Sequence, residues 1–276
     1  MADLASARAA RVSRLQAREG TVRSFVVPGI QTGVKISEKA GLALGSVTWD
    51  GAVVLSEYLA SPKEALKGKG ELVCELGAGT GLSGTTAALC GCQVLLTDKA
   101  GEVTSIMRET VELNGDSIAA AGGHADVLEL SWGDAEATTR AVDWASMRGS
   151  TGVFDIILGA DIVFKTDLVE ALLETIEGLV PPGSKTRVLL AYRERGAGDI
   201  FFRGAIERGF ALSVTAASSG SPPCQTSLEA VLRDAENAAA APGYASFDFH
   251  VVVEMRRGQS RVPLRCRPSA LKGPAD

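Results

Sequence analysis

Residues 74–82 read Cys-Glu-Leu-Gly-Ala-Gly-Thr-Gly-Leu, an acidic residue followed by three glycines at alternate positions. The acidic residue is Glu75, and the glycines are Gly77, Gly79 and Gly81. Glycine lets a backbone turn sharply and approach a ligand closely. An apolar run precedes the loop and a helical pattern follows it, which places the loop at the carboxyl end of a strand, where open α/β sheets bind ligands. The sequence therefore predicts a small-molecule site at this loop.

Two phosphate-containing ligands are natural candidates for a glycine loop. A nucleoside triphosphate loop ends in Gly-Lys-Ser/Thr, which this sequence lacks, so that class is excluded. A dinucleotide fits better, because residues 79–84 satisfy Gly-x-Gly-x-x-Gly and Asp98 lies where a ribose-binding acid is expected. Glu75, however, lies two residues before Gly77 and would repel a pyrophosphate. A dinucleotide-dependent dehydrogenase remains an alternative that the surroundings of the loop disfavour.

A ligand with positive charge suits these carboxylates better. S-adenosylmethionine carries an ammonium, a sulfonium and a ribose diol. We expect Glu75 to serve its cationic end and Asp98 to accept hydrogen bonds from its ribose hydroxyls. In the alternative interpretation Glu75 only caps a helix or is solvated, and Asp98 has a structural role.

From residue 71 onward, short β-rich runs alternate with helical patterns, which is typical of a parallel sheet with crossover helices. The predicted strands are residues 71–76, 93–98, 125–130, 154–164 and 187–192. The predicted helices are residues 82–90, 102–114, a short one within 135–152, 167–180 and 198–208. Asn114 is expected to cap the second of these helices at its C-terminus. The strand at 154–164 begins with an unbroken apolar run, so we expect it to be central and buried on both faces.

The last part of the sheet follows a different pattern. Residues 210–216 and 247–255 read as strands without a crossover of the earlier kind between them. We expect them to pair antiparallel at one edge of the sheet. Residues 218–246 are then an insertion, with a Ser/Gly/Pro loop and a predicted helix at 227–240.

Further motifs accompany the glycine loop. The second strand ends in Leu-Leu-Thr-Asp at residue 98, the third is followed by Trp132-Gly133-Asp134, and the fourth runs into Gly-Ala-Asp-Ile-Val-Phe at residues 159–164. Gly-Ser-Val-Thr-Trp at residues 45–49 precedes the sheet, and Ala-Tyr-Arg-Glu-Arg at residues 191–195 follows the fifth strand, with two phenylalanines after it.

Together with Glu-x-Gly-x-Gly-x-Gly, these motifs resemble those of a seven-stranded class I methyltransferase. More narrowly, Asp161-Ile162-Val163-Phe164 and the Gly-x-x-x-Trp segment resemble the methyltransferase-like family 21 group of protein-lysine methyltransferases, where the fourth strand is followed by an acid-x-x-Tyr/Phe motif. The resemblance covers about residues 24–216 and returns at 247–257, and the insertion is unmatched.

The resemblance implies a doubly wound, mostly parallel α/β sheet of seven strands, with the seventh inserted antiparallel between the fifth and the sixth. We expect a single methyltransferase domain at residues 23–257. Within it, residues 23–70 hold an N-terminal β-hairpin with a glycine turn, at 24–38, and a lead-in helix at 48–60. Residues 1–22 are expected to form an N-terminal helix or flexible arm, and residues 258–276 a flexible tail.

The same resemblance implies roles for individual residues. Asp161 is expected to align the acceptor lysine and Phe164 to wall its channel, because an aromatic face attracts an ammonium group by about 0.5–2 kcal/mol. Trp132 is expected to border the adenine ring, and Trp49 to close over the cofactor. The expected cofactor-binding residues are Trp49, Glu75, Gly77, Ala78, Gly79, Asp98, Trp132 and Ala160, and the expected catalytic residues are Asp161 and Phe164.

Each of these side chains also has a structural interpretation. Asp161 would then cap the helix that begins near residue 167, while Phe164 and the two tryptophans would belong to the core. Arg193 and Arg195 contact the substrate backbone in one interpretation and only pair with neighbouring acids in the other. His250, inside an apolar strand, is interpreted as a packed structural histidine.

Composition limits the partners. The 276 residues carry a formal net charge of −5, which disfavours a general nucleic-acid-binding surface. The apolar runs are far shorter than the roughly 20 residues that span a bilayer, so no membrane segment is predicted. With 5 cysteines and 2 histidines, the sequence predicts neither a disulfide framework nor a metal site.

We expect a monomeric, cytoplasmic enzyme that takes S-adenosylmethionine as cofactor and a protein substrate presenting a lysine. Reduced thiols favour a cytosol-like compartment. A mitochondrial or nuclear location is the alternative, because the N-terminus has some likeness to a transit peptide, interrupted by Asp3 and Glu19. The arginines that carry this likeness are Arg8, Arg11, Arg14, Arg18 and Arg23.

Two other functions remain open on the sequence alone. The glycine loop reports the cofactor and not the acceptor, so the enzyme could methylate an arginine or a small molecule. The chain could also be a non-catalytic module that keeps the fold, although the intact acidic and glycine residues of the loop speak against this.

Overall fold

The computed structural model describes residues 20–61, 66, 70–149, 151–193, 195–217 and 250–258. The expected N-terminal helix or arm (1–22), the insertion (218–246) with its helix, and the tail (258–276) lie outside these residues, apart from residues 20–22 and 258. None of the described helices is both long and apolar enough to cross a membrane.

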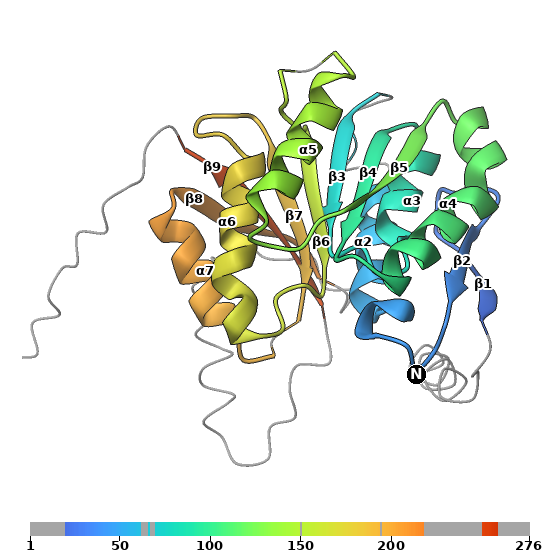
Figure 1. Cartoon of the computed structure of the whole chain (residues 1–276), viewed down its shortest axis with the longest axis horizontal. Coiled ribbons are helices and arrows are strands. Elements are labelled where there is room, and N and C mark those ends of the chain that lie inside the picture. The colour runs from blue at the N-terminus through green and yellow to red at the C-terminus, as the bar shows by residue number, and fades with distance from the viewer. Residues whose placement is uncertain are drawn as a thin grey trace, which may run out of the picture.

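A single seven-stranded sheet carries the fold, with strand order β5-β4-β3-β6-β7-β9-β8 (Figure 1). Its strands are β3 (Leu72–Leu76), β4 (Gln93–Asp98), β5 (His124–Glu129), β6 (Ile156–Ala160), β7 (Arg187–Tyr192), β8 (Phe210–Ala217) and β9 (Val251–Arg257). The neighbours from β5 to β7 are parallel, whereas β9 pairs antiparallel with both β7 and β8. The predicted doubly wound sheet, with its last strand inserted antiparallel, is therefore confirmed.

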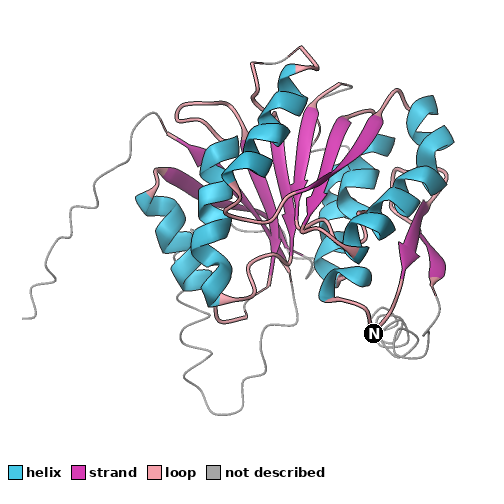
Figure 2. Ribbon diagram, viewed as in Figure 1, coloured by secondary structure: helices cyan, strands magenta, loops and turns pink. Residues whose placement is uncertain are grey.

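Helices cover both faces of the sheet (Figure 2). One layer consists of α2 (Asp50–Ala60), α3 (Leu82–Leu89) and α4 (Glu102–Ala120), and the other of α5 (Ala135–Ser146), α6 (Val169–Leu179) and α7 (Gly198–Glu207). Two 3₁₀ turns, η1 (Leu44–Ser46) and η2 (Thr166–Leu168), lie in the connecting loops. Each predicted helix within the described residues is present with shifted ends.

The largest shift concerns α4, which continues to Ala120 instead of ending near Asn114. Asn114 is not a cap. Its buried amide donates hydrogen bonds to the carbonyls of Thr110 (2.7 Å) and Lys35 (2.6 Å), and its oxygen accepts from Lys35 N–H at 3.0 Å. These bonds dock the hairpin of β1 (Thr21–Phe25) and β2 (Val34–Glu38), which pair antiparallel as predicted. The sequence analysis ended the helix too early because Asn114 is a polar residue on the buried face of α4, where the apolar pattern is interrupted although the helix continues.

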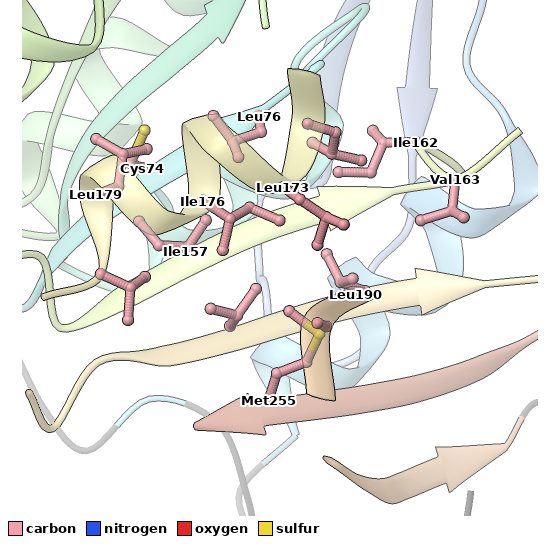
Figure 3. Close-up of a cluster of buried hydrophobic side chains, with 14 of the residues drawn as sticks. Cys74, Leu76, Ile157, Ile162, Val163, Leu173, Ile176, Leu179, Leu190 and Met255 are labelled. Atoms are coloured by element: carbon pink, nitrogen blue, oxygen red, sulfur yellow. The ribbon is translucent and has the colours of Figure 1, made fainter. Parts of the chain in front are cut away.

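The alternation of side chains along β3 divides the core into two halves. Leu72, Cys74 and Leu76 face the layer of α5, α6 and α7, whereas Val73 packs in the layer of α2, α3 and α4. Figure 3 shows Cys74 and Leu76 among the side chains of the first layer. Side chains alternate across a strand, so Glu75 shares the face of Val73. This places a carboxyl group under the start of α3.

The fourth predicted strand, 154–164, is shorter in the structure, where β6 ends at Ala160. The next residue, Asp161, has a φ of +56° and turns the chain out of the sheet. Ile162 and Val163 nevertheless stay buried, in the same core cluster as Leu173 and Ile176 of α6 (Figure 3). Continued burial explains why the apolar run looked longer than the strand.

Candidate functional site

The carboxyl ends of β3, β4 and β6 open into a cavity of about 550 Å³. All expected site residues except Glu75 line it, namely Trp49, Gly77, Ala78, Gly79, Asp98, Trp132, Ala160, Asp161 and Phe164. Leu42, Leu44, Lys99 and Val103, which the sequence did not single out, also line it. Segments far apart along the chain thus meet at one edge of the sheet, as expected for this topology.

The glycine loop between β3 and α3 forms one wall. Gly77 and Gly79 have φ angles of +60° and +57°, in the left-handed region that glycine tolerates. A Cβ on Gly77 would lie 3.0 Å from Cζ2 of Trp132, and one on Gly79 would lie 3.2 Å from the carbonyl oxygen of Gly45. Both positions therefore need glycine for backbone conformation and for close approach.

Asp98 lies at the end of β4, beside this loop. One carboxylate oxygen accepts a hydrogen bond from Gly79 N–H at 2.9 Å, and the other accepts from Lys99 N–H at 2.8 Å. Burial raises the pKa of the Asp98 carboxyl, while the two backbone hydrogen bonds and the Lys99 charge pull it down. Each carboxylate oxygen can accept a further hydrogen bond, so Asp98 can bind a ligand hydroxyl in the cavity.

Glu75 does not reach the cavity wall. It is 1% exposed, and its carboxylate accepts a hydrogen bond from Gly84 N–H at 2.8 Å. Burial raises the pKa of Glu75 to about 8, against the hydrogen bonds from Gly84 and Ser83. The expectation that Glu75 serves a cationic ligand group is corrected: the side chain lies behind the glycine loop, because strand alternation points it at α3, where it holds the loop-to-helix turn.

Residues 39–49, which we call the cover segment, cross the glycine loop before α2 begins. Trp49 lies at its end, is 37% exposed, and donates from Nε1 to the carbonyl of Leu44 at 2.8 Å. The hydroxyls of Thr48 and Thr80 lie 2.9 Å apart and join the segment to the loop. The Trp49 ring is thereby held at the cavity, where the resemblance placed it.

Trp132 and Phe164 complete the aromatic part of the lining. Trp132 is half-buried and packs against Gly77. Phe164 is also half-buried, with the Lys165 ammonium 6.0 Å from its ring centroid. Both rings line the cavity, so neither belongs wholly to the core.

Asp161 is the only non-glycine residue with a positive φ among those described. Its side chain is 4% exposed and accepts hydrogen bonds from Gly51 N–H (3.0 Å) and from Nε2 of His250 (3.0 and 3.1 Å). The guanidinium of Arg195 lies 3.3 Å from the same carboxylate. Strained backbone of this kind persists where the surroundings fix it, and it is frequent at functional sites.

The pKa of Asp161 follows from these partners. Burial pushes it up, but the His250 hydrogen bond and the charges of His250 and Arg195 outweigh burial and hold it below its usual value. The cavity therefore contains an ionised carboxylate tied to three separate elements: the start of α2, the loop after β7 and the start of β9. It does not cap η2 or α6, which begin after it, and instead accepts from a first-turn N–H of α2.

The sequence did not reveal His250 and Arg195 as partners of Asp161. His250 is 89 residues away and meets Asp161 only because β9 inserts beside β7. No local pattern marks such a contact. The sequence left open whether Arg195 contacts the substrate or pairs with a neighbouring acid. In the structure it pairs with Asp161, which is distant in sequence.

These features can be tested against S-adenosylmethionine as the ligand. A Cβ would fill the glycine cradle at Gly77 and Gly79, so the backbone is exposed for close approach. Asp98 offers a carboxylate to the ribose hydroxyls, and the aromatic and apolar lining suits an adenine ring. No feature of the lining requires a diphosphate, and the residues present fit the cofactor. Fold and site together define a class I S-adenosylmethionine-dependent methyltransferase.

The chain belongs to the lysine methyltransferase family, whose model matches residues 30–208. It is 38% identical over 172 residues to the mouse protein N-lysine methyltransferase METTL21A, covering 62% of this chain and 71% of the relative. It is 32% identical over 183 residues to the mouse EEF1A lysine methyltransferase 3, covering 66% of this chain and 71% of the relative. A mouse histone-arginine methyltransferase, METTL23, is 30% identical over 166 residues, or 59% of each chain.

Solved structures agree on the fold. A putative transferase from Pyrococcus horikoshii superposes with a TM-score of 0.51 at 16% identity, covering 88% of this chain and 74% of that one. A 16S rRNA methyltransferase from T. thermophilus, in complex with AdoMet and guanosine, has a TM-score of 0.50 at 13% identity, covering 87% of this chain and 50% of that one. The predicted resemblance, S-adenosylmethionine as cofactor, and protein lysine methylation as the activity are confirmed.

Proposed function

We propose that the cavity at the carboxyl ends of β3, β4 and β6 binds S-adenosylmethionine and receives the side chain of a lysine on a protein substrate. In this proposal Asp98 binds the ribose, Trp132 borders the adenine, and Trp49 closes over the ligand. Asp161 and Phe164 form the acceptor side. The observation that carries the proposal is that the expected site residues from five separate segments line one cavity, with Glu75 behind it.

When bound, S-adenosylmethionine supplies a sulfonium-activated methyl group, which moves to a neutral lysine nitrogen as the methyl–sulfur bond breaks and S-adenosylhomocysteine is left. The protein has to position the acceptor, which can contribute up to roughly 7–11 kcal/mol in favourable systems. A lysine has an ordinary pKa of about 10.4, so it must lose a proton in or near the site.

The lining of the cavity favours the neutral amine. Leu42 and Leu44 of the cover segment and Val103 of α4 contribute apolar side chains to the lining. Apolar surroundings disfavour the ammonium form and lower the pKa of a lysine. In this proposal the apolar part of the lining lowers the pKa of the acceptor lysine and so raises the fraction of neutral amine.

The remaining expectations extend the proposal. The net charge of −5 supports a protein substrate and disfavours a nucleic acid. We include a single catalytic domain over residues 23–257, a monomeric state and a cytoplasmic location. Limited proteolysis of the purified chain tests the single domain, and light scattering tests the monomeric state. Imaging of the tagged full chain tests the cytoplasmic location.

The first experiment titrates the full chain with S-adenosylhomocysteine and follows binding by calorimetry, with Asp98→Ala beside it. The second incubates the chain with labelled S-adenosylmethionine and purified EEF1A, the protein in the name of one relative, and with a cell extract. Mass spectrometry then identifies the methylated residue. Methyllysine supports the proposal, whereas methylarginine, the product implied by the name of another relative, contradicts it.

A further inference from the structure

Arg195 contacts both Asp161 and Trp49 at the cavity. Its terminal nitrogen lies 3.3 Å from the Asp161 carboxylate, and its guanidinium carbon lies 5.2 Å from the centroid of the Trp49 ring. The Arg195 side chain is 25% exposed, against 4% for Asp161. One guanidinium therefore joins the carboxylate on the acceptor side to the tryptophan of the cover segment.

Charged or titratable residues lie near Asp161 on three elements: α2, the start of β9 and the loop after β7. His250, at the start of β9, contacts the carboxylate but does not line the cavity. Asp50 begins α2, beside the Gly51 N–H that also binds the carboxylate. Arg195 both contacts the carboxylate and lines the cavity, whose other charged lining residues in the described chain are Asp98 and Lys99.

An uncompensated carboxylate at the acceptor side would work against the reaction. A carboxylate stabilises a neighbouring ammonium and raises the pKa of a lysine. The acceptor lysine has to be neutral. His250 and Gly51 N–H also bind the carboxylate, but neither residue lines the cavity, so without Arg195 the carboxylate would face the lysine with no cation beside it in the cavity and would favour the unreactive ammonium. A cation facing the cavity removes this effect by compensating the carboxylate charge and by disfavouring a second cation.

We propose that Arg195 is a positioning residue that compensates the charge of Asp161, so that the acceptor amine enters the cavity neutral. The inference rests on the proposed function, since it assumes that the acceptor lysine reaches the Asp161 side of the cavity. Arg195 acts through Asp161 and makes no contact with the transferred group. The contact with the Trp49 ring helps to hold the guanidinium at the cavity.

A pair of adenosine-based bisubstrate analogues tests this without knowledge of the protein substrate. One carries an alkylamine arm that mimics lysine, and the other carries an isosteric arm that ends in a methyl group. The measured quantity is the ratio of their affinities at pH 7.5 and at pH 9.0, by calorimetry on the full chain. The variants are Arg195→Gln, Arg195→Lys and Arg195→Gln with Asp161→Asn.

If the wild-type site takes a neutral amine, the affinity of the amine analogue relative to the methyl analogue rises by about tenfold per pH unit. Arg195→Lys is expected to keep this slope. Arg195→Gln is expected to raise the ratio at pH 7.5 by at least ~10-fold and to flatten its pH dependence, because the ammonium is then held by Asp161. Adding Asp161→Asn is expected to cancel that rise.

Arg203→Gln is the matched control, because Arg203 lies exposed on α7 and pairs with Asp199 on the same helix. It should leave both the ratio and its slope unchanged. An Arg195→Gln ratio and slope equal to those of the wild type would overturn the inference, and so would an Arg195→Lys variant that behaves like Arg195→Gln. Failure of the wild type to bind either analogue or S-adenosylhomocysteine would instead overturn the proposed function on which the inference rests.

Discussion

A carboxylate oxygen of Asp98 accepts a hydrogen bond of 2.9 Å from the backbone N–H of Gly79, which joins the end of β4 to the middle of the glycine loop. The loop is therefore shaped by the same side chain that lines the cavity. Its opposite side is held by Glu75, whose carboxylate accepts from Gly84 N–H. Two acids from neighbouring strands thus fix one loop, and only Asp98 lines the cavity.

Asp98→Ala is expected to weaken S-adenosylhomocysteine binding by at least ~10-fold. The change removes the charge-assisted hydrogen bond that we propose Asp98 makes to the ribose, a kind of bond that typically contributes about 1.5–3 kcal/mol, and it frees the loop at Gly79. Titration calorimetry measures the effect. Asp143→Ala, at an exposed position on α5, is the control and should bind as the wild type does. Equal affinities for all three proteins would remove Asp98 from the ribose site.

Gly79→Ala is expected to abolish ligand binding while the fold survives. An alanine there adopts an unfavourable φ and also places its Cβ 3.2 Å from the Gly45 carbonyl, so the loop or the cover segment must shift. Gly122→Ala separates the two effects, because Gly122 has a φ of +77° and no heavy atom within 4 Å of an added Cβ. Both variants should lose about 1–2 kcal/mol of stability. Calorimetry should show intact ligand binding for Gly122→Ala. If both variants lost ligand binding, the close approach of Gly79 to Gly45 would not be the cause of the loss.

Much of the fold could be predicted because its signals are local. The apolar runs predicted the bounds of β4 and β7 as they are observed, Gln93–Asp98 and Arg187–Tyr192. The strand ends carried the glycine loop and Asp98, and parallel topology brings such ends together. Errors arose where tertiary contacts override a local pattern. Asn114 looked like a helix end but binds Lys35 of the hairpin.

The candidate site was predictable in its composition and not in its contacts. Nine of the lining residues were found from motifs, since ligand-binding loops follow particular strands, whereas Leu42, Leu44, Lys99 and Val103 were not. The partners of Asp161 were not found, because a contact between Asp161 and His250 depends on which strand inserts beside β7. The position of Glu75 was misjudged because its place at a strand end was considered without the alternation that turns it toward α3.

Glu75 is expected to make the stability of the protein depend on pH. Burial raises its pKa from the ordinary value of about 4.5 to about 8. A carboxyl with a raised folded-state pKa stabilises the fold fully below its unfolded pKa, and this contribution is lost as the pH rises through the folded pKa. Between about pH 4.5 and pH 8 the wild type should therefore lose stability at this residue.

Glu75→Gln removes the titration and keeps an acceptor for Gly84 N–H. Its free energy of unfolding relative to the wild type should therefore rise from pH 5 to pH 8, by an amount on the order of a few kcal/mol. Urea unfolding at the two pH values measures this difference. The prediction fails if the difference in unfolding free energy between the variant and the wild type is the same at pH 5 and at pH 8.

Asp161→Ala and Asp161→Gly are expected to differ in an unusual direction. Both remove the buried carboxylate and leave His250 and Arg195 without this partner, which typically costs about 3–5 kcal/mol. Elsewhere, glycine is the more destabilising of the two residues by roughly 0.5–1 kcal/mol, because it loses more backbone entropy on folding. At a φ of +56° the order reverses, since alanine has to adopt a left-handed conformation that glycine occupies freely.

In urea unfolding at pH 7.5, the free energy of unfolding of Asp161→Gly should accordingly exceed that of Asp161→Ala by about 1 kcal/mol. Asp161→Asn should rank above both, because asparagine tolerates the left-handed region and keeps one oxygen to accept from Gly51 N–H. An alanine variant as stable as the glycine variant would mean that the turn after β6 relaxes once the carboxylate is gone. The strained backbone would then be a consequence of the contacts with His250 and Arg195, and the turn itself would not hold the side chain at the cavity.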